Sequence, residues 1–208
     1  MSLTTMWTHG NSLRVEDPGE YQNVRHRGWG AVLTYARRRD DEQNLDELSP
    51  RYCHIPIPTP TVVDGAAPWL SKVYVLFETQ GNAKLHEVGV WDADNLVKTF
   101  ADNSEGLNGR FGSFLTLSAF NQFSLDELYV VQKGIGITLA IQLDIVADND
   151  SEHTGQPPAP PTTESDPWIL TVTAVGADFV YPRSPLSVFT GFSQVAVAQG
   201  SRVKVGSK

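Results

Sequence analysis

Apolar and polar residues alternate with a period of two along much of the chain, most clearly between residues 134 and 146. There, six aliphatic residues share one face of an extended chain, whereas polar residues occupy the other face. Side chains of a β-strand point to opposite faces in turn, so this pattern predicts a strand with one buried face. The aliphatic residues are Ile135, Ile137, Leu139, Ile141, Leu143 and Ile145.

Similar segments follow one another with turn residues between them, which predicts a chain built of strands. Residues 69–80 are apolar on both faces, as expected of a central strand. In residues 84–91 the apolar positions change parity, which a β-bulge near Gly89 would explain. We also expect a hairpin within residues 6–15. Further strands are predicted at 31–35, 96–100, 110–117, 125–132 and 168–181.

Residues 52–64 separate a polar, turn-rich region from the alternating segments that follow. Within them, Ile55 and Ile57 alternate with Pro56 and Pro58. Proline has no backbone N–H and a fixed φ, so one side of this segment cannot donate to a sheet ladder. The pattern predicts an extended segment at a sheet edge, where the prolines protect against unwanted strand pairing.

About eight to ten strands with little helix predict an all-β fold, an antiparallel β-sandwich of jelly-roll-like type. A closed barrel is the alternative. We expect residues 1–208 to form a single domain, with an exposed loop at about 37–50 and a flexible proline-rich loop at about 148–167. The strands at 134–146 and 168–181, which flank the second loop, are expected to be antiparallel neighbours.

The net charge and the single cysteine limit the classes of protein to which this chain could belong. The net charge is −8, which argues against a nucleic-acid partner because phosphate binding needs a concentrated positive surface. One cysteine, Cys53, cannot form an intramolecular disulfide, and we expect it to be buried. The chain has neither a secretory-signal pattern nor a run of roughly 20 apolar residues. We therefore expect no membrane partner and, by default, a cytoplasmic location.

The sequence lacks the motifs of common enzyme classes. It contains no phosphate-binding loop and no nucleophile elbow, and its five histidines are dispersed. Cys53 and His54 are adjacent, so on a strand they would point to opposite faces and could not form a thiolate–imidazole pair.

Asp92, Asp94 and Asn95 are the candidate metal ligands, because a cluster of side-chain oxygens suits Ca²⁺. The EF-hand spacing is absent, however, and Asp and Asn are also the residues that turns prefer. We expect a structural turn here and no cofactor, with Ca²⁺ as the alternative.

Five polar and aromatic residues near the Pro-rich segment form a candidate ligand-binding surface. They are His9, Arg25, Arg27, Trp29 and His54. Arginine can bind a carboxylate through two hydrogen bonds and tryptophan can stack on a ring, so an anionic or sugar ligand would suit them. The alternative is that Trp29 belongs to the core and that the arginines are solvated or paired with acidic residues.

Four short motifs resemble an uncharacterised family of small bacterial β-proteins, a domain of unknown function. They are HGN at 9–11, GWG at 28–30, HIPIPTP at 54–60 and VWD at 90–92. The resemblance covers about residues 6–146 and implies no activity.

Three functions remain open at this stage. The leading hypothesis is a non-catalytic β-sandwich that binds a small molecule, a glycan or a protein. The second is a metal-dependent hydrolase or lyase whose dispersed histidines and aspartates converge in the fold. The third is a structural, self-assembling protein that forms homo-oligomers through the Pro-rich sheet edge or through the C-terminal tail.

Overall fold

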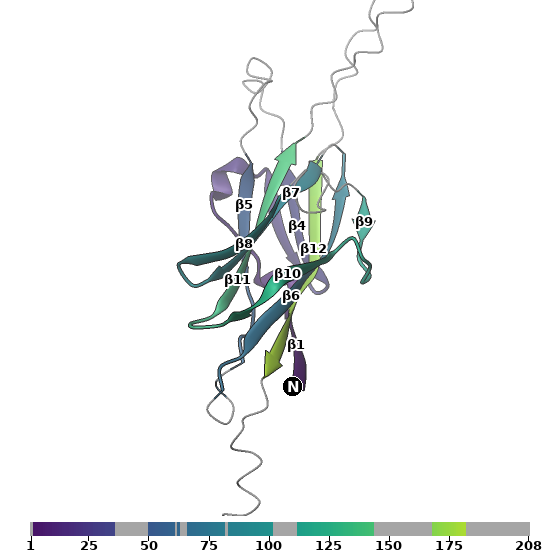
Figure 1. Ribbon diagram of the computed structural model, residues 1–208. Helices are drawn as coiled ribbons and strands as arrows, with labels where there is room; N and C mark the ends of the chain where they lie inside the picture. Colours follow the sequence, from purple (N-terminus) through teal and green to yellow (C-terminus); the bar gives the residue numbers. More distant parts are fainter. Residues whose placement is uncertain are drawn as a thin grey trace, which may run out of the picture.

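Two antiparallel sheets pack against each other in the computed structural model of this chain (Figure 1). The structure describes residues 2–35, 50–60, 62, 66–81, 83–101, 112–143 and 168–181. These residues form twelve strands and two short 3-10 helices, η1 (Gly10–Ser12) and η2 (Pro18–Glu20). The arrangement confirms the predicted all-β sandwich. The strand count exceeds the prediction partly because two strands span only two residues each, too few for alternation to show.

The first sheet has seven strands and the second has five. The first contains, in order, β10 (Gln122–Val130), β6 (Trp69–Gln80), β12 (Trp168–Tyr181), β4 (Gly30–Tyr35) and β3 (Asn23–Arg27). In the same sheet, β1 (Ser2–His9) pairs with β12, and β9 (Ser113–Phe114) pairs with β6. The second contains, in order, β2 (Arg14–Val15), β5 (Arg51–Pro56), β11 (Ile135–Leu143), β7 (Ala83–Asp92) and β8 (Asn95–Ala101).

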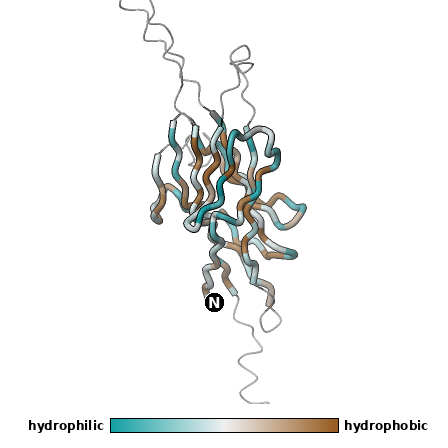
Figure 2. Tube along the Cα trace, turned by 180° about the vertical axis from the view of Figure 1, so that it is seen from behind, coloured by the Kyte–Doolittle hydropathy of each residue, from teal (hydrophilic) through white to brown (hydrophobic). Residues whose placement is uncertain are grey.

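The hydrophobic core lies between the two sheets and takes alternate residues from each strand. Along the strands, apolar positions alternate with polar ones (Figure 2). On β11, four aliphatic residues predicted to share a buried face do so, namely Ile135, Ile137, Leu139 and Ile141. Removing such surfaces from water supplies roughly 25 cal/mol per Å², which is why the period-two pattern dictates which face turns inward.

Two glycines bring the first turns of the chain against the centre of the first sheet. A Cβ atom on Gly10 would lie 2.0 Å from the Val172 carbonyl oxygen, and one on Gly30 would lie 2.4 Å from the same atom. No larger residue fits either position without displacing the β12 backbone. Gly10 belongs to the HGN motif and Gly30 to the GWG motif, so both motifs carry a packing requirement.

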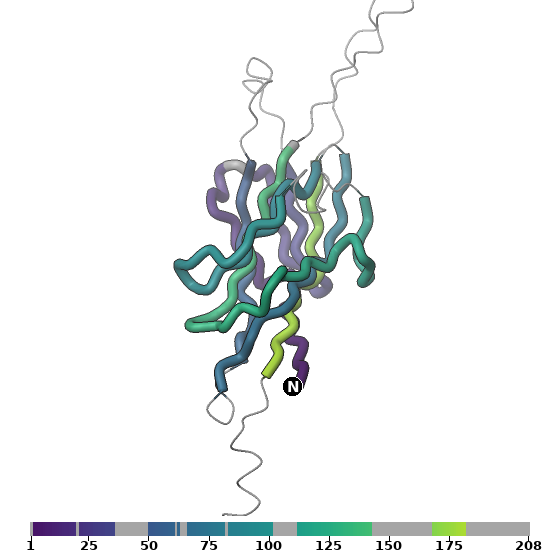
Figure 3. The backbone as a smooth tube through the Cα atoms, viewed as in Figure 1, coloured from purple at the N-terminus to yellow at the C-terminus, as the bar shows by residue number. Residues whose placement is uncertain are grey.

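Two predicted pairings are wrong. Residues 6–15 form no hairpin, because β1 pairs with β12 whereas β2 pairs with β5 in the other sheet. The strands on either side of the proline-rich loop are not neighbours, because β11 pairs with β5 and β7 whereas β12 pairs with β6, β4 and β1. Figure 3 shows β1 running beside β12 at the end of the first sheet. Alternation identifies strands but does not tell which sheet each joins.

The predicted bulge exists but lies closer to the start of β7. Glu87 and Leu85 pair with consecutive residues of β11, so the extra residue is His86 rather than Gly89. The bulge restores one parity for the buried side chains on either side of it, as the sequence pattern required.

The Pro-rich segment is a sheet edge over only part of its length. Beside β5, the two-residue strand β2 covers Cys53 and His54, so the edge prediction is wrong there. Beyond them, no described strand pairs with the second side of Pro56, although its carbonyl accepts a hydrogen bond from Thr8 Oγ1 at 2.8 Å. The predicted donor-poor edge is therefore confirmed at the end of β5.

The two predicted loops lie almost entirely outside the residues that the structure describes. The loop at about 37–50 lies outside the described residues except for Pro50, and the loop at about 148–167 lies wholly outside them. These loops and the single domain over 1–208 stay predictions. Within the described part of the chain, no helix is long and apolar enough to cross a membrane.

Candidate functional site

The five residues of the predicted ligand surface do not converge. Arg25 and Arg27 lie on β3, at the edge of the first sheet, and Trp29 follows in the turn to β4. Trp29 is 55% exposed, so the alternative that placed it in the core is wrong. His9 ends β1, and its Nδ1 accepts a hydrogen bond from the Asn11 N–H at 3.2 Å. His54 lies on β5 of the second sheet and lines a groove to which the other four residues do not contribute.

Asp92, the first candidate metal ligand, is buried and fully engaged within the protein. Its carboxylate accepts backbone N–H bonds from Gln132 (2.6 Å), Lys133 (2.9 Å) and Gly134 (2.7 Å) and a hydroxyl bond from Tyr129 (3.2 Å). Burial alone would raise the pKa of this carboxyl, but the three backbone donors outweigh it and hold the pKa below its ordinary value. Asp92 thus anchors the turn between β10 and β11.

Asp94 and Asn95 also bind neighbouring side chains. Asp94 forms an ion pair with Lys133, and Asn95 donates to the hydroxyl of Tyr129 at 3.2 Å. Among the described residues, no group of three or more His, Cys, Asp or Glu side chains could hold a metal ion. The expected structural turn accounts for the contacts of all three residues, through hydrogen bonds and the Asp94–Lys133 ion pair.

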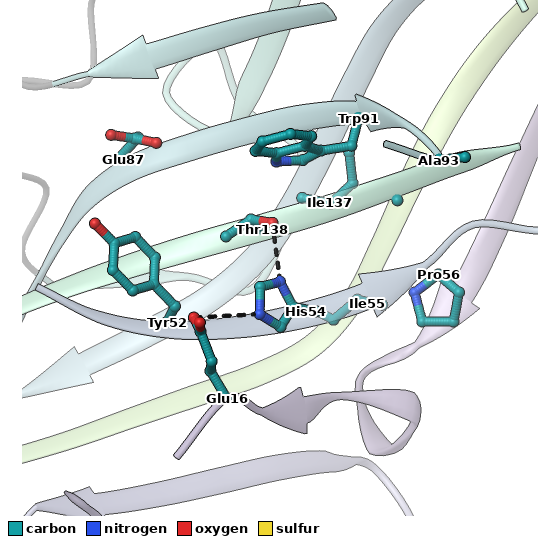
Figure 4. Close-up of a pocket in the computed structure, with 11 residues that line it drawn as sticks. Glu16, Tyr52, His54, Ile55, Pro56, Glu87, Trp91, Ala93, Ile137 and Thr138 are labelled. Atoms are coloured by element: carbon teal, nitrogen blue, oxygen red, sulfur yellow. Dashed lines mark hydrogen bonds and ion pairs between the residues drawn. The ribbon is translucent and has the colours of Figure 1, made fainter. Parts of the chain in front are cut away.

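A groove of about 700 Å³ crosses the outer face of the second sheet (Figure 4). Its volume lies within the range of roughly 300–1,000 Å³ that is usual for small-molecule sites. Its lining residues come mainly from β5, β11 and β7. They are Glu16, Tyr52, His54, Ile55, Pro56, Glu87, Trp91, Ala93, Gly136, Ile137 and Thr138.

The groove follows from the residues that these three strands place on their outer faces. The central strand, β11, carries small residues there, whereas its neighbours mostly carry larger ones. The pairing puts Tyr52, Ala140 and Glu87 in one cross-strand row, His54, Thr138 and Gly89 in the next, and Pro56, Gly136 and Trp91 in the third. Gly136 and Thr138 of β11 form the floor, Ala140 is buried and does not line the groove, and the larger residues of β5 and β7 form the walls.

Trp91 lies along β7 because Gly89 has no side chain. A Cβ atom on Gly89 would lie 3.1 Å from Trp91 Nε1, 3.6 Å from Thr138 Cβ and 3.7 Å from Glu87 Oε1. The indole therefore extends from its own position toward Glu87, over the space above Gly89 (Figure 4). Within the described part of the chain, the carboxylate of Glu87 has neither a hydrogen-bond nor an ion-pair partner.

His54 connects a hydroxyl on the floor to a carboxylate on the rim. Its Nδ1 lies 2.9 Å from Thr138 Oγ1, and its Nε2 lies 3.6 Å from Glu16 Oε2. The side chains of His54 and Glu16 are 46% and 63% exposed, so both remain accessible from the groove. The Glu16 contact orients the imidazole, and the ring in turn orients the hydroxyl of Thr138.

The groove combines aromatic and polar groups but carries little positive charge. It holds two carboxylates, Glu16 and Glu87, and its one basic side chain is His54. An anion would be repelled, since like charges brought together cost several kcal/mol. The arrangement suits a ligand that can stack on a ring and donate hydrogen bonds to carboxylates. Cys53 does not line the groove, because it lies on β5 with its side chain buried in the core. This burial raises the pKa of its thiol.

Sequence reasoning found only His54 among the groove residues. It missed Glu16, Tyr52, Glu87, Trp91 and Thr138, because their meeting depends on the pairing of β5, β11 and β7. One signal was present, since β11 alternates large aliphatic residues with Gly136, Thr138 and Ala140 on its polar face. Three small outer residues on one central strand are what a hollow over a sheet requires.

Comparison with known proteins identifies a family that has no assigned activity. The family of unknown function DUF6623 matches residues 1–153. No match was found among curated proteins or among solved structures. The matched region contains every residue that lines the groove, whereas β12 lies beyond it.

Proposed function

Since the chain belongs to the DUF6623 family, which has no assigned activity, we propose from the groove itself that it is a small-ligand-binding β-sandwich. The observation that carries this proposal is the convergence of aromatic and polar walls from β5 and β7 above a floor of small residues on β11. A concave site with a few convergent polar groups is the usual form of a small-molecule site.

The groove is built on strands, which hold side chains more rigidly than loops do. The inner faces of β5, β11 and β7 pack in the core, so the groove side chains on their outer faces are held at fixed spacing. The polar groups also point outward to water, and Glu87 has no partner among the described residues, so no described contact has to break to admit a ligand.

The test is to fill the groove without disturbing the fold. A Cβ atom on Gly136 would meet nothing within 4 Å, so Gly136→Val adds a side chain to the groove floor without a clash at Cβ. The matched control is Gly28→Val, because Gly28 is equally open but lies in the turn between β3 and β4. We expect metabolites that raise the Tm of the original chain and of Gly28→Val to have no effect on Gly136→Val.

Two outcomes would contradict a ligand site in the groove. If a broad metabolite library raises the Tm of none of the proteins, or raises it equally in Gly136→Val, the groove is not a ligand site. Unfolding in urea without ligand should give similar midpoints for the two variants, which shows that the floor substitution leaves the fold intact.

A second candidate function rests on the contacts of His54. A hydroxyl, an imidazole and a carboxylate in sequence are the groups that many hydrolases use, with the imidazole as base. Thr138, His54 and Glu16 are joined in this order. Turnover of activated esters by the original chain that disappears in Thr138→Val and in His54→Gln would support an enzyme. Rates in both variants equal to that of the original chain would exclude this role.

A further inference from the structure

We propose that the ligand of the groove is a neutral sugar, bound with one pyranose ring stacked on Trp91 and its hydroxyls held by Glu87 and by the His54–Thr138 pair. This inference rests on the proposed function and names its ligand class. It follows from three properties of the groove, namely the flat indole of Trp91, the Glu87 carboxylate, which has no partner among the described residues, and the absence of lysine and arginine from the lining.

The aromatic surface is positioned for stacking. The indole of Trp91 lines the groove and reaches the space above Gly89 with its Nε1 edge, 3.1 Å from where a Cβ atom would lie. Aromatic faces carry partial negative charge, and the C–H groups on one side of a pyranose ring carry partial positive charge. A saturated ring therefore stacks on such a surface, and its size matches that of an indole.

Polar groups lie beside Trp91 in the groove. Glu87 and Thr138 line the groove with it, and Glu87 Oε1 and Trp91 Nε1 both border the space above Gly89, at 3.7 and 3.1 Å from where a Cβ atom would lie. Hydrogen bonds from a hydroxyl to a carboxylate are among the stronger neutral-ligand contacts, because the acceptor is charged. The imidazole of His54, whose two nitrogens face Thr138 and Glu16, holds the Thr138 hydroxyl in place, and that hydroxyl can form a further hydrogen bond with a ligand hydroxyl.

Other small ligands use less of this chemistry. Phosphates and carboxylates would face Glu16 and Glu87 with no lysine or arginine in the groove to offset them. A quaternary ammonium would be attracted by the indole and the carboxylates, but it would leave the Thr138 hydroxyl and His54 without a hydrogen-bond partner on the ligand. A neutral sugar engages both the stacking surface and the hydrogen-bonding groups.

The test is titration calorimetry on the full chain with methyl glycosides of glucose, galactose and mannose, and with α- and β-linked disaccharides of each. Choline and inorganic phosphate serve as cationic and anionic probes. We expect at least one sugar to bind, and both probes to fail. Trp91→Ala should weaken binding by about tenfold or more, as loss of a stacking partner worth roughly 1.4 kcal/mol predicts. Trp91→Phe should retain part of the affinity because a smaller ring remains.

Matched variants separate this site from the rest of the surface. Trp29→Ala removes an exposed tryptophan outside the groove and should leave sugar affinity unchanged. Glu87→Gln keeps the size of the side chain and should weaken binding several-fold, because a charged acceptor becomes a neutral one. Binding that is indifferent to Trp91→Ala, or equally sensitive to Trp29→Ala, would overturn the proposed site.

Failure of this inference differs from failure of the proposed function. If no sugar in the panel binds, the sugar proposal is wrong. If, in that case, other metabolites still stabilise the chain and lose this effect in Gly136→Val, the groove remains a ligand site of a different class. Binding of choline that Trp91→Ala abolishes would identify that class as an organic cation.

Discussion

Each sheet carries a tryptophan beside a glycine, and the two pairs differ in what surrounds them. On the first sheet, a Cβ atom on Gly176 would lie 2.7 Å from the ring of Trp7, which stacks on Tyr74 with the ring centroids 5.4 Å apart. On the second sheet, Trp91 approaches Gly89 with its Nε1 edge, and no aromatic ring of the described residues stacks on it.

The polar groups beside the two tryptophans make the same distinction. On the first sheet, the buried carboxylate of Asp178 accepts hydrogen bonds from Thr5 Oγ1 at 2.6 Å and from Tyr74 Oη at 2.5 Å. The pKa of the Tyr74 hydroxyl is raised, mainly by burial and to a lesser degree by its hydrogen bond to Asp178. On the second sheet, Glu87 is unpaired within the described residues. Groups that satisfy one another stabilise the fold, whereas unpaired groups at a groove are available to a ligand.

The largest expected effect tests the first sheet. Asp178→Ala removes two hydrogen bonds to a buried carboxylate and leaves the Tyr74 hydroxyl without its acceptor. Hydrogen bonds to charged groups are worth roughly 1.5–3 kcal/mol each, so we expect a loss of about 3 kcal/mol in the free energy of unfolding. Urea titration followed by fluorescence measures it. A loss below about 1 kcal/mol would contradict the structural role of this cluster.

Asp92 gives the next largest effect and carries a pH dependence. Asp92→Asn keeps the shape but loses the charge that three backbone N–H groups stabilise, and we expect a cost of about 2 kcal/mol. Because the folded-state pKa of Asp92 is lowered, its contribution is full above the unfolded pKa of roughly 3.9 and is lost as the pH falls through the folded value.

The measurement for Asp92 is the urea midpoint of both proteins between neutral and acid pH. The difference between the original chain and Asp92→Asn should be constant above about pH 5 and should shrink below about pH 4. A difference that grows on acidification would contradict the assignment of Asp92 as the charged anchor of this turn.

How far the sequence predicts this molecule depends on whether a property is local. Alternation along residues 135–141 identifies β11 and its buried face, because the side-chain period belongs to the strand itself. Pairing is not local, so the sequence could not show that β12 joins the first sheet while β11 joins the second. The close packing of Gly10 and Gly30 is not local either, because their shared neighbour, the Val172 carbonyl, lies more than a hundred residues away along the chain.

The candidate site depends even more on pairing. His54 was identified from its position beside prolines, but its neighbours on the groove come from three strands and the segment that follows β2. Trp91 was recognised only within the VWD motif, and the bulge at His86 obscured which face it occupies. The arginines of β3 stood near His54 in the sequence-based hypothesis, but the two sheets separate them.

The two glycines offer a direct comparison of the tryptophans. In Gly176→Ala the new methyl would overlap the Trp7 ring, and we expect a loss of about 1–2 kcal/mol in the free energy of unfolding, typical of overpacking. In Gly89→Ala the methyl meets only the edge of the Trp91 ring, which can move into the groove, so stability should change by under about 0.5 kcal/mol. Equal losses in the two variants would show that both tryptophans are packed elements of the fold.

The smallest expected effect is also the sharpest test of the second sheet as a binding face. Glu16→Gln breaks the contact with His54, whose side chain, like that of Glu16, is largely exposed. Exposed ion pairs contribute roughly 0–1 kcal/mol, so we expect the free energy of unfolding to change by less than about 0.5 kcal/mol. Ligand affinity should nevertheless fall, because His54 loses the partner that orients it. A stability loss as large as that of Asp178→Ala would instead make the His54 contacts part of the fold, and the two outer faces would then be equivalent.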